Sequence, residues 1–332
     1  MTWKRFSWSR NFSLQRKGQG VRDRRNTTIE RSTMQQVWKV LAPIDLAYDP
    51  ESAVEHAIHV ATAMDAELTL LYVANQLRPA GDNRLAWPQN ALAAGRTPRG
   101  IRRRVLPGKA ADMIVRYAEL SDADLVLMAS ENCGGWKRFW KHSVAAEVMA
   151  NSRRPLWIID WKAIDDDYHF KCRTILCVLN LDGADEPVVR HAESVALRSG
   201  GEVILASAVP ESGEHLLHEA IGGSNRPLTA QLALERMGAL GAELSAPFKT
   251  SVMTGSLNRC ARLAAQQHSA DIVVASSAAP GSMSANSLDI RSVLRQLPCP
   301  VVSVRHNPSA ARRRQIAMVE QPVLRKFAIF RS

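Results

Sequence analysis

The sequence has no long hydrophobic run, no cysteine pair at metal-binding spacing and no recognisable catalytic motif. No stretch reaches the roughly 18 uninterrupted apolar residues that a membrane-spanning helix needs, so we expect no membrane span. Its five cysteines are scattered without a CxxC pair, which favours reduced thiols in a cytoplasmic protein. A G-x-S-x-G elbow, a P-loop with its lysine, a G-x-G-x-x-G turn and a paired-carboxylate signature are also missing. The sequence therefore does not predict an enzyme.

Acidic residues are scarce at the two ends of the chain, and this scarcity accounts for the net charge of +11 over 332 residues. Residues 1–36 hold nine Lys and Arg against two acids, and residues 307–332 hold six against one. The part between them is close to neutral. Composition therefore predicts a folded region without the basic surface typical of nucleic-acid-binding domains, flanked by two basic tails.

The N-terminal tail interleaves basic residues with the aromatic side chains of Trp3, Phe6, Trp8 and Phe12. Such segments can contact nucleic acid or a membrane surface, which is one interpretation of the basic tails. We favour disorder instead, because the tail cannot bury enough apolar surface to fold alone. Translation from Met34, just before the first apolar run, is a further alternative.

The region between the tails contains the same pattern twice. Each copy begins with an apolar run typical of a strand, followed by apolar residues at helical spacing and a second strand-like run. A Gly-led helix and a further apolar run come next, and each copy ends with a short helix and a Pro-led strand. The opening runs are residues 37–45 and 173–181, and the Gly-led segments are residues 106–130 and 253–277.

Strands that alternate with helices predict right-handed βαβ crossovers and a parallel sheet. We therefore expect an α/β chain of two tandem flavodoxin-like domains, each a five-stranded parallel sheet of order 3-2-1-4-5 with helices on both faces. The predicted domains span residues 37–161 and 172–306, with a linker at 162–171. A helix around residues 228–240 is expected in the second copy, whereas residues 75–100 of the first are rich in Pro and Gly and favour a loop.

Two polar groups in the first copy have ordinary structural interpretations. His56 and His59 lie three residues apart on an amphipathic helix, and no third ligand is fixed by the sequence, so we predict no metal site. Asp122 and Asp124 precede an apolar strand and are interpreted as solvated charge.

Four segments in the same order, twice over, resemble the universal stress protein family. They are an apolar strand ending in Asp45, a capped helix, a Gly-led helix before a strand of the ADLVLMAS type, and a short helix before a Pro-led VVSV strand. The resemblance covers residues 37–161 and 172–306. It implies the tandem subclass, in which the two halves pack as an intramolecular pseudo-dimer, and a role in the cytoplasmic stress response. The resemblance is also compatible with a homodimer of the whole chain.

Some members of that family bind ATP through a loop of the form G-x2-G-x9-G-[ST] after the fourth strand, with an aspartate from the first strand near the adenosine. Backbone N–H groups that cradle a phosphate need residues that tolerate positive φ and carry no Cβ. In the first copy the three glycine positions read Ala129, Asn132 and His142, while Asp45 and Ser143 match the pattern. The cradle is therefore degenerate there.

The second copy departs further from the pattern. Its glycine positions read Ser276, Ala279 and Ser287, the terminal hydroxyl position is Leu288, and Asn180 replaces the aspartate. We therefore expect the second copy to bind no nucleotide.

We predict a protein that acts in stress survival by binding rather than by catalysis. The alternative is that the first copy binds ATP, as a binder or a slow ATPase, with loop cations taking over the phosphate contacts. The candidate nucleotide-site residues are Asp45, Asn132, Lys137, Arg138, His142 and Ser143.

Overall fold

The computed structural model describes residues 37–46, 50–74, 98–130, 143–160, 172–181, 185–209, 228–277, 288, 290–294, 296–297 and 299–305. The two predicted tails and the predicted linker lie outside the described residues, so the predicted domain boundaries stay predictions. Among the described residues, no helix has the length and apolarity to cross a membrane.

The first half alternates strands and helices along the chain. Its elements are β1 (Lys39–Pro43), α1 (Pro50–Ala63), β2 (Glu67–Ala74), β3 (Gly100–Pro107), α2 (Ala110–Leu120), β4 (Leu125–Ser130), α3 (Val144–Asn151) and β5 (Leu156–Asp160).

The second half repeats this succession, and its described residues include one further helix. Its elements are β6 (Thr174–Val178), α4 (Glu186–Ser199), β7 (Glu202–Val209), α6 (Ala230–Ala242), β8 (Phe248–Thr254), α7 (Leu257–Gln267), β9 (Ile272–Ser277), α8 (Ile290–Leu294) and β10 (Val301–Arg305). The helix predicted around residues 228–240 is therefore confirmed as α6, whereas most of its counterpart region in the first half lies outside the described residues.

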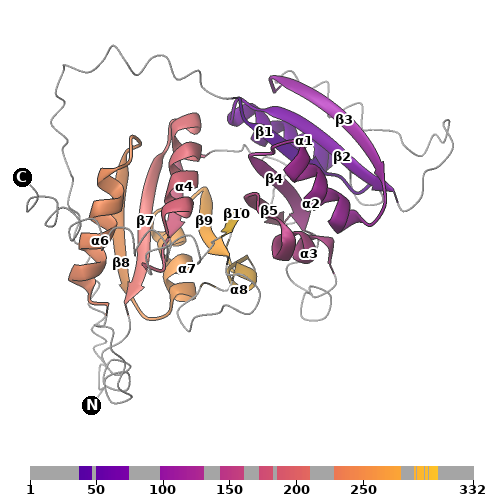
Figure 1. Cartoon of the computed structure of the whole chain (residues 1–332). Helices are drawn as coiled ribbons and strands as arrows, with labels where there is room; N and C mark the ends of the chain where they lie inside the picture. The colour runs from indigo at the N-terminus through magenta and orange to yellow at the C-terminus, as the bar shows by residue number, and fades with distance from the viewer. Residues whose placement is uncertain are drawn as a thin grey trace, which may run out of the picture.

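All ten strands form one sheet in the order β3-β2-β1-β4-β5-β10-β9-β6-β7-β8 (Figure 1). Within each half the pairing is parallel, and both halves have the predicted order 3-2-1-4-5. β5 and β10 pair antiparallel in the middle, with Trp157 opposite Val302. The α/β fold class and the tandem arrangement are therefore confirmed, and the sheet is continuous across the two halves.

The same backbone conformations recur in both halves. Gly108 and Gly255 directly follow β3 and β8, with φ of +134° and +117°. Residues that carry a Cβ rarely adopt such backbone conformations. Asp124 and Asp271 each precede a strand, and each carboxylate accepts a backbone N–H at the start of the neighbouring first strand, from Lys39 at 2.9 Å and Thr174 at 2.9 Å. These recurrences support a duplicated unit.

The interpretation of Asp122 and Asp124 as solvated charge is confirmed for Asp122, whose carboxylate is exposed, and is wrong for Asp124. Asp124 accepts the Lys39 N–H and so holds the start of β1, and the exposed carboxylate of Asp122 pairs with Arg154 at 2.9 Å. Both carboxylates lie where they can meet donors from elements that are distant in sequence, which local pattern does not reveal.

Two apolar layers cover the faces of the sheet. One contains buried residues of α1, α4 and α6, and the other those of α2, α3, α7 and α8. Each layer includes strand residues from both halves, so neither half has a core of its own on either face. Cys172, Cys177 and Cys260 are part of these layers, and burial raises the pKa of the Cys172 and Cys260 thiols to about 12. These three cysteines act as small apolar residues.

Further contacts join the two halves beside the β5–β10 pair. The ring of Trp38, the residue before β1, stacks on His191 of α4, with 5.5 Å between ring centroids, and the Arg198 guanidinium lies 4.8 Å from the centroid of the same indole ring. Arg305 of β10 donates to the carbonyl oxygens of Ala150 at 2.9 Å and Ser152 at 3.2 Å. These carbonyls belong to the end of α3, where a helix has no intrahelical donors left.

Candidate functional site

Asp45 lies at the carboxyl edge of the sheet in the first half. It follows β1 by two residues and is exposed, and the preceding Ile44 N–H still bonds to Leu71 O at 2.8 Å. β1 pairs in parallel with β4, with Val40 opposite Leu125, so the carboxyl ends of both strands lie at one edge. This is the edge where ligands bind in sheets of this winding.

Ser143 forms the N-cap of α3, the helix that follows β4. Its Oγ accepts the Ala146 N–H at 3.1 Å, which is the ordinary capping contact. A hydroxyl that accepts this bond keeps its own proton for a second acceptor, so the cap and a phosphate contact are compatible. The residues predicted at the other loop positions, Asn132, Lys137, Arg138 and His142, lie outside the described residues, and their roles stay predictions.

A carboxylate already lies at the start of α3. Glu147 is in the first turn of the helix, where a negative charge interacts favourably with the helix dipole. Lys109, just before α2, pairs with this carboxylate at 2.5 Å. The hydrogen bond that Lys109 donates to Glu147, together with the nearby Asp112 and Glu147 charges, raises the pKa of Lys109. A phosphate at this helix end would therefore meet a carboxylate, and Lys109 is already paired with that carboxylate.

The turn after β6 in the second half is filled by a side chain of the protein itself. The Asp185 carboxylate accepts the N–H groups of Asn180 at 3.0 Å and Leu181 at 2.7 Å. Leu181 has a φ of +57°, and successive N–H groups in such a turn form a concavity that binds anions. Asp185 is 4% exposed, and Arg236 of α6 donates to Leu181 O at 2.8 Å.

The first half has no such carboxylate at the equivalent position. With the offset of 135 residues that relates Asp45 to Asn180, Asp185 corresponds to Pro50. Asp185 and Arg236 were not among the residues predicted from the sequence. The offset could have revealed Asp185, because it aligns this aspartate with Pro50 and so shows that the two copies differ there. Arg236 could not be found in this way, because it reaches the turn only through the packing of α6.

Comparisons with known proteins agree with the fold of the whole chain, and a family model matches the first half. Residues 38–160 match the model of the universal stress protein family. No curated protein matches the chain in sequence.

Two solved structures match both halves together. A universal stress protein from Archaeoglobus fulgidus DSM 4304 is 18% identical, with a TM-score of 0.57, and the match covers 81% of this chain and 99% of that one. A functionally unknown protein from Pseudomonas aeruginosa PAO1 is 17% identical, with a TM-score of 0.54 and coverage of 86% and 99%. At these identities the likeness concerns the fold.

Proposed function

We propose that this chain, which belongs to the universal stress protein family and carries two of its units in tandem, serves stress survival in the cytoplasm by binding rather than by catalysis. The observation that carries the proposal is that both strand ends where a nucleotide would bind are altered or already occupied. In the second half the Asp185 carboxylate takes two backbone donors of the turn. In the first half the glycines of the phosphate loop are replaced, and Glu147 lies at the helix start.

A specific observation favours one alternative, ATP binding by the first half with slow hydrolysis. Asp45 is exposed at the carboxyl edge, and Ser143 caps the helix that follows β4. In this alternative Asp45 contacts the ribose or adenine, and Ser143 with the loop cations contacts the phosphates. The second half does not take part in this alternative, because Asn180 stands where the first half has Asp45.

Calorimetric titration of the full chain with ATP and magnesium separates the two. The proposal predicts no heat of binding up to millimolar ATP. Micromolar binding that disappears in Asp45→Ala and Ser143→Ala would replace it by the alternative. Ser143→Thr keeps both the hydroxyl and the cap, and Ser256→Ala removes an N-cap of the same kind from α7, so these two variants distinguish loss of the site from loss of a cap.

A further inference from the structure

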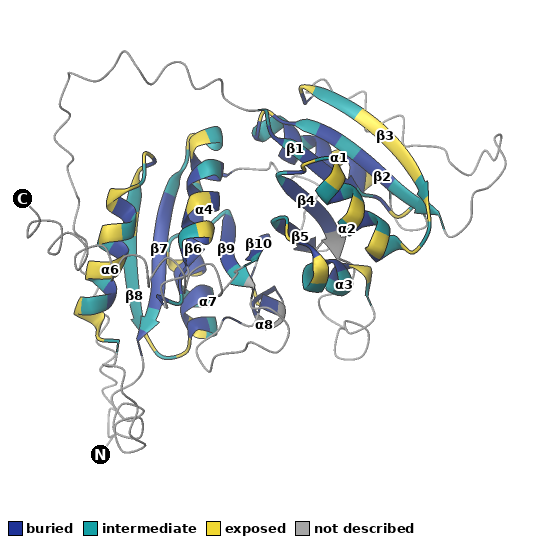
Figure 2. Ribbon diagram, in the orientation of Figure 1, coloured by how far each residue is buried: buried dark blue, intermediate teal, exposed yellow. Residues whose placement is uncertain are grey.

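β3 is an edge strand of the ten-stranded sheet, and its charge and exposure differ from those of every strand inside it. Four successive residues, Arg102 to Val105, are exposed (Figure 2). An ordinary edge strand alternates between a covered and an open face, so exposure over four successive residues means that, among the described residues, both faces are open at these positions. Val105 is among the few large apolar side chains exposed in the described residues, at 38%.

The opposite edge strand of the sheet, β8, has a helix packed on one face. α6 packs along it, with Gly241 against the Phe248 ring. The cation on this strand, Lys249, pairs with Glu202 of the neighbouring strand at 2.8 Å. Within the part of the chain that the structure describes, the cation of β8 is paired and a helix covers one of its faces, whereas neither holds for Arg103 and Arg104 of β3.

The arginines of β3 lie on both faces of the sheet. Arg103 is opposite Leu70, which belongs to the α1 layer, and Arg104 is opposite Leu71, which belongs to the α2 layer. Arg102 shares the face of Arg104 and pairs with Glu67 at 3.2 Å. Among the described residues, no acidic side chain forms an ion pair with Arg103 or Arg104.

We propose that the outer edge of β3 docks an extended acidic peptide segment of another protein, which adds to the sheet as a further strand. The outer N–H and C=O groups of an edge strand are a template for such a segment. Carboxylates at successive positions of the segment would face arginines on both sides of the sheet, and opposite charges across a strand pair attract. An apolar residue of the segment would cover Val105.

The chemistry of the edge favours a peptide over a nucleic acid. A phosphate backbone has no groups that continue the ladder of a sheet, and lying along one face it would leave the arginines of the other face unused. The folded region as a whole is also close to neutral. A second copy of this chain fits poorly, because pairing of two β3 strands would set arginine against arginine.

Basic residues on an edge strand also have a protective role, since they keep sheets from joining edge to edge. A purely protective role predicts no affinity for an acidic strand. Docking predicts binding that needs both the charges and the backbone groups of the partner. The two roles can therefore be separated by probes in which charge and backbone are changed independently.

The probe is a fluorescein-labelled eight-residue peptide with glutamates at successive positions and one valine to cover Val105, titrated with the full chain and followed by fluorescence anisotropy. We expect the affinity to fall about tenfold or more in Arg103→Glu/Arg104→Glu, since two attractive cross-strand pairs become repulsive. Arg116→Glu/Arg153→Glu changes the charge equally at exposed positions away from β3, and its affinity should stay within about twofold of the unmodified chain. The basic tails contribute equally to all three proteins.

The same peptide with alternate backbone nitrogens methylated keeps its charge but cannot pair with a strand edge, and its binding should be lost. Equal binding of the methylated peptide, an equal loss in both double variants, or no binding of the acidic peptide would overturn the proposal. A single-stranded oligonucleotide that binds more tightly than the peptide through Arg103 and Arg104 would assign the edge to nucleic acid and overturn it as well.

Discussion

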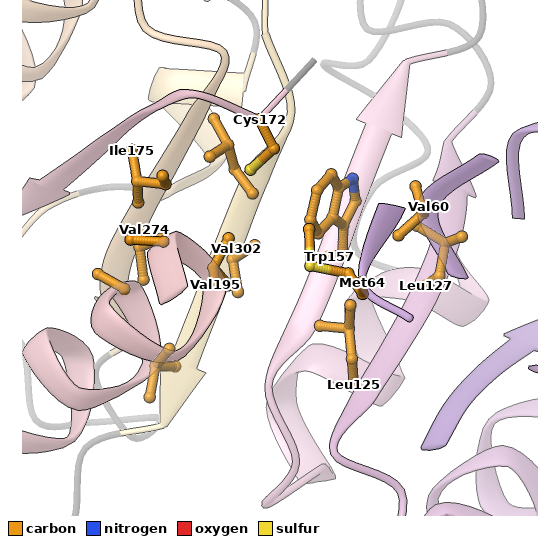
Figure 3. Packing of buried hydrophobic residues seen from close by; sticks show 14 of the residues in the cluster. Val60, Met64, Leu125, Leu127, Trp157, Cys172, Ile175, Val195, Val274 and Val302 are labelled. Carbon is orange, nitrogen blue, oxygen red and sulfur yellow. The ribbon is translucent and has the colours of Figure 1, made fainter. Parts of the chain in front are cut away.

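Replacing Trp157 by alanine tests whether the two halves share one core. Trp157 of β5 is completely buried and lies opposite Val302 in the antiparallel pair with β10. It packs with Val60, Met64 and Leu127 in the layer that also contains Val302 (Figure 3). A buried tryptophan truncated to alanine costs about 3–5 kcal/mol of unfolding free energy, from lost transfer energy and the cavity that remains. Because its layer contains residues of both halves, this loss should reach the second half.

Hydrogen exchange followed by mass spectrometry measures the loss segment by segment. In Trp157→Ala, protection should fall in β4, which pairs with residue 157, and also in β6 and β9, neither of which pairs with β5. Trp157→Phe retains most of the ring volume and should show a smaller loss in the same segments. Unchanged protection of β6 and β9, with loss confined to the first half, would refute the shared core.

Three further predictions concern the interface, the second half and pH. Arg305→Ala removes two charge-assisted bonds to the end of α3 and should lower the unfolding free energy by about 1–3 kcal/mol in urea denaturation, whereas no change would mean that water replaces them. Gly241→Ala forces a Cβ into the Phe248 ring and should cost about 1–3 kcal/mol, while Gly238→Ala in the same helix meets nothing and should be neutral or stabilising. Equal thermal midpoints of these two variants would contradict the packing of α6. Burial lowers the pKa of His56 to about 3 and of His191 to about 4, so the unfolded chain takes up protons below about pH 6.5 that the folded chain does not. The unfolding free energy should therefore fall with decreasing pH between about 6.5 and 4, by up to about 1.4 kcal/mol per pH unit for each histidine, and a chain with glutamine at both positions should lose most of that slope.

The repeat in the sequence was sufficient to predict the fold of each half. Gly108 with Gly255, and Asp124 with Asp271, recur at one offset, and the structure gives each pair one backbone role. The junction was not predictable in the same way. Pairing of β5 with β10 depends on contacts between residues more than a hundred positions apart, for which local apolar patterns carry no signal.

The candidate site was predictable only in part. The positions of Asp45 after β1 and of Ser143 at a helix start follow from the alternation of strands and helices. The buried carboxylate of Asp185 was missed because an aspartate before a helix is ordinarily interpreted as a cap, and here it instead accepts two N–H groups of the preceding turn. His191 was missed because its partner, Trp38, belongs to the other half.

Mass spectrometry of small molecules released by denaturing the purified, natively expressed protein tests the central claim most directly. If the strand ends have lost their capacity to hold a triphosphate, the protein should release no adenine nucleotide in amounts that approach one per chain. Release of about one adenylate per chain, abolished by Asp45→Ala, would contradict the account.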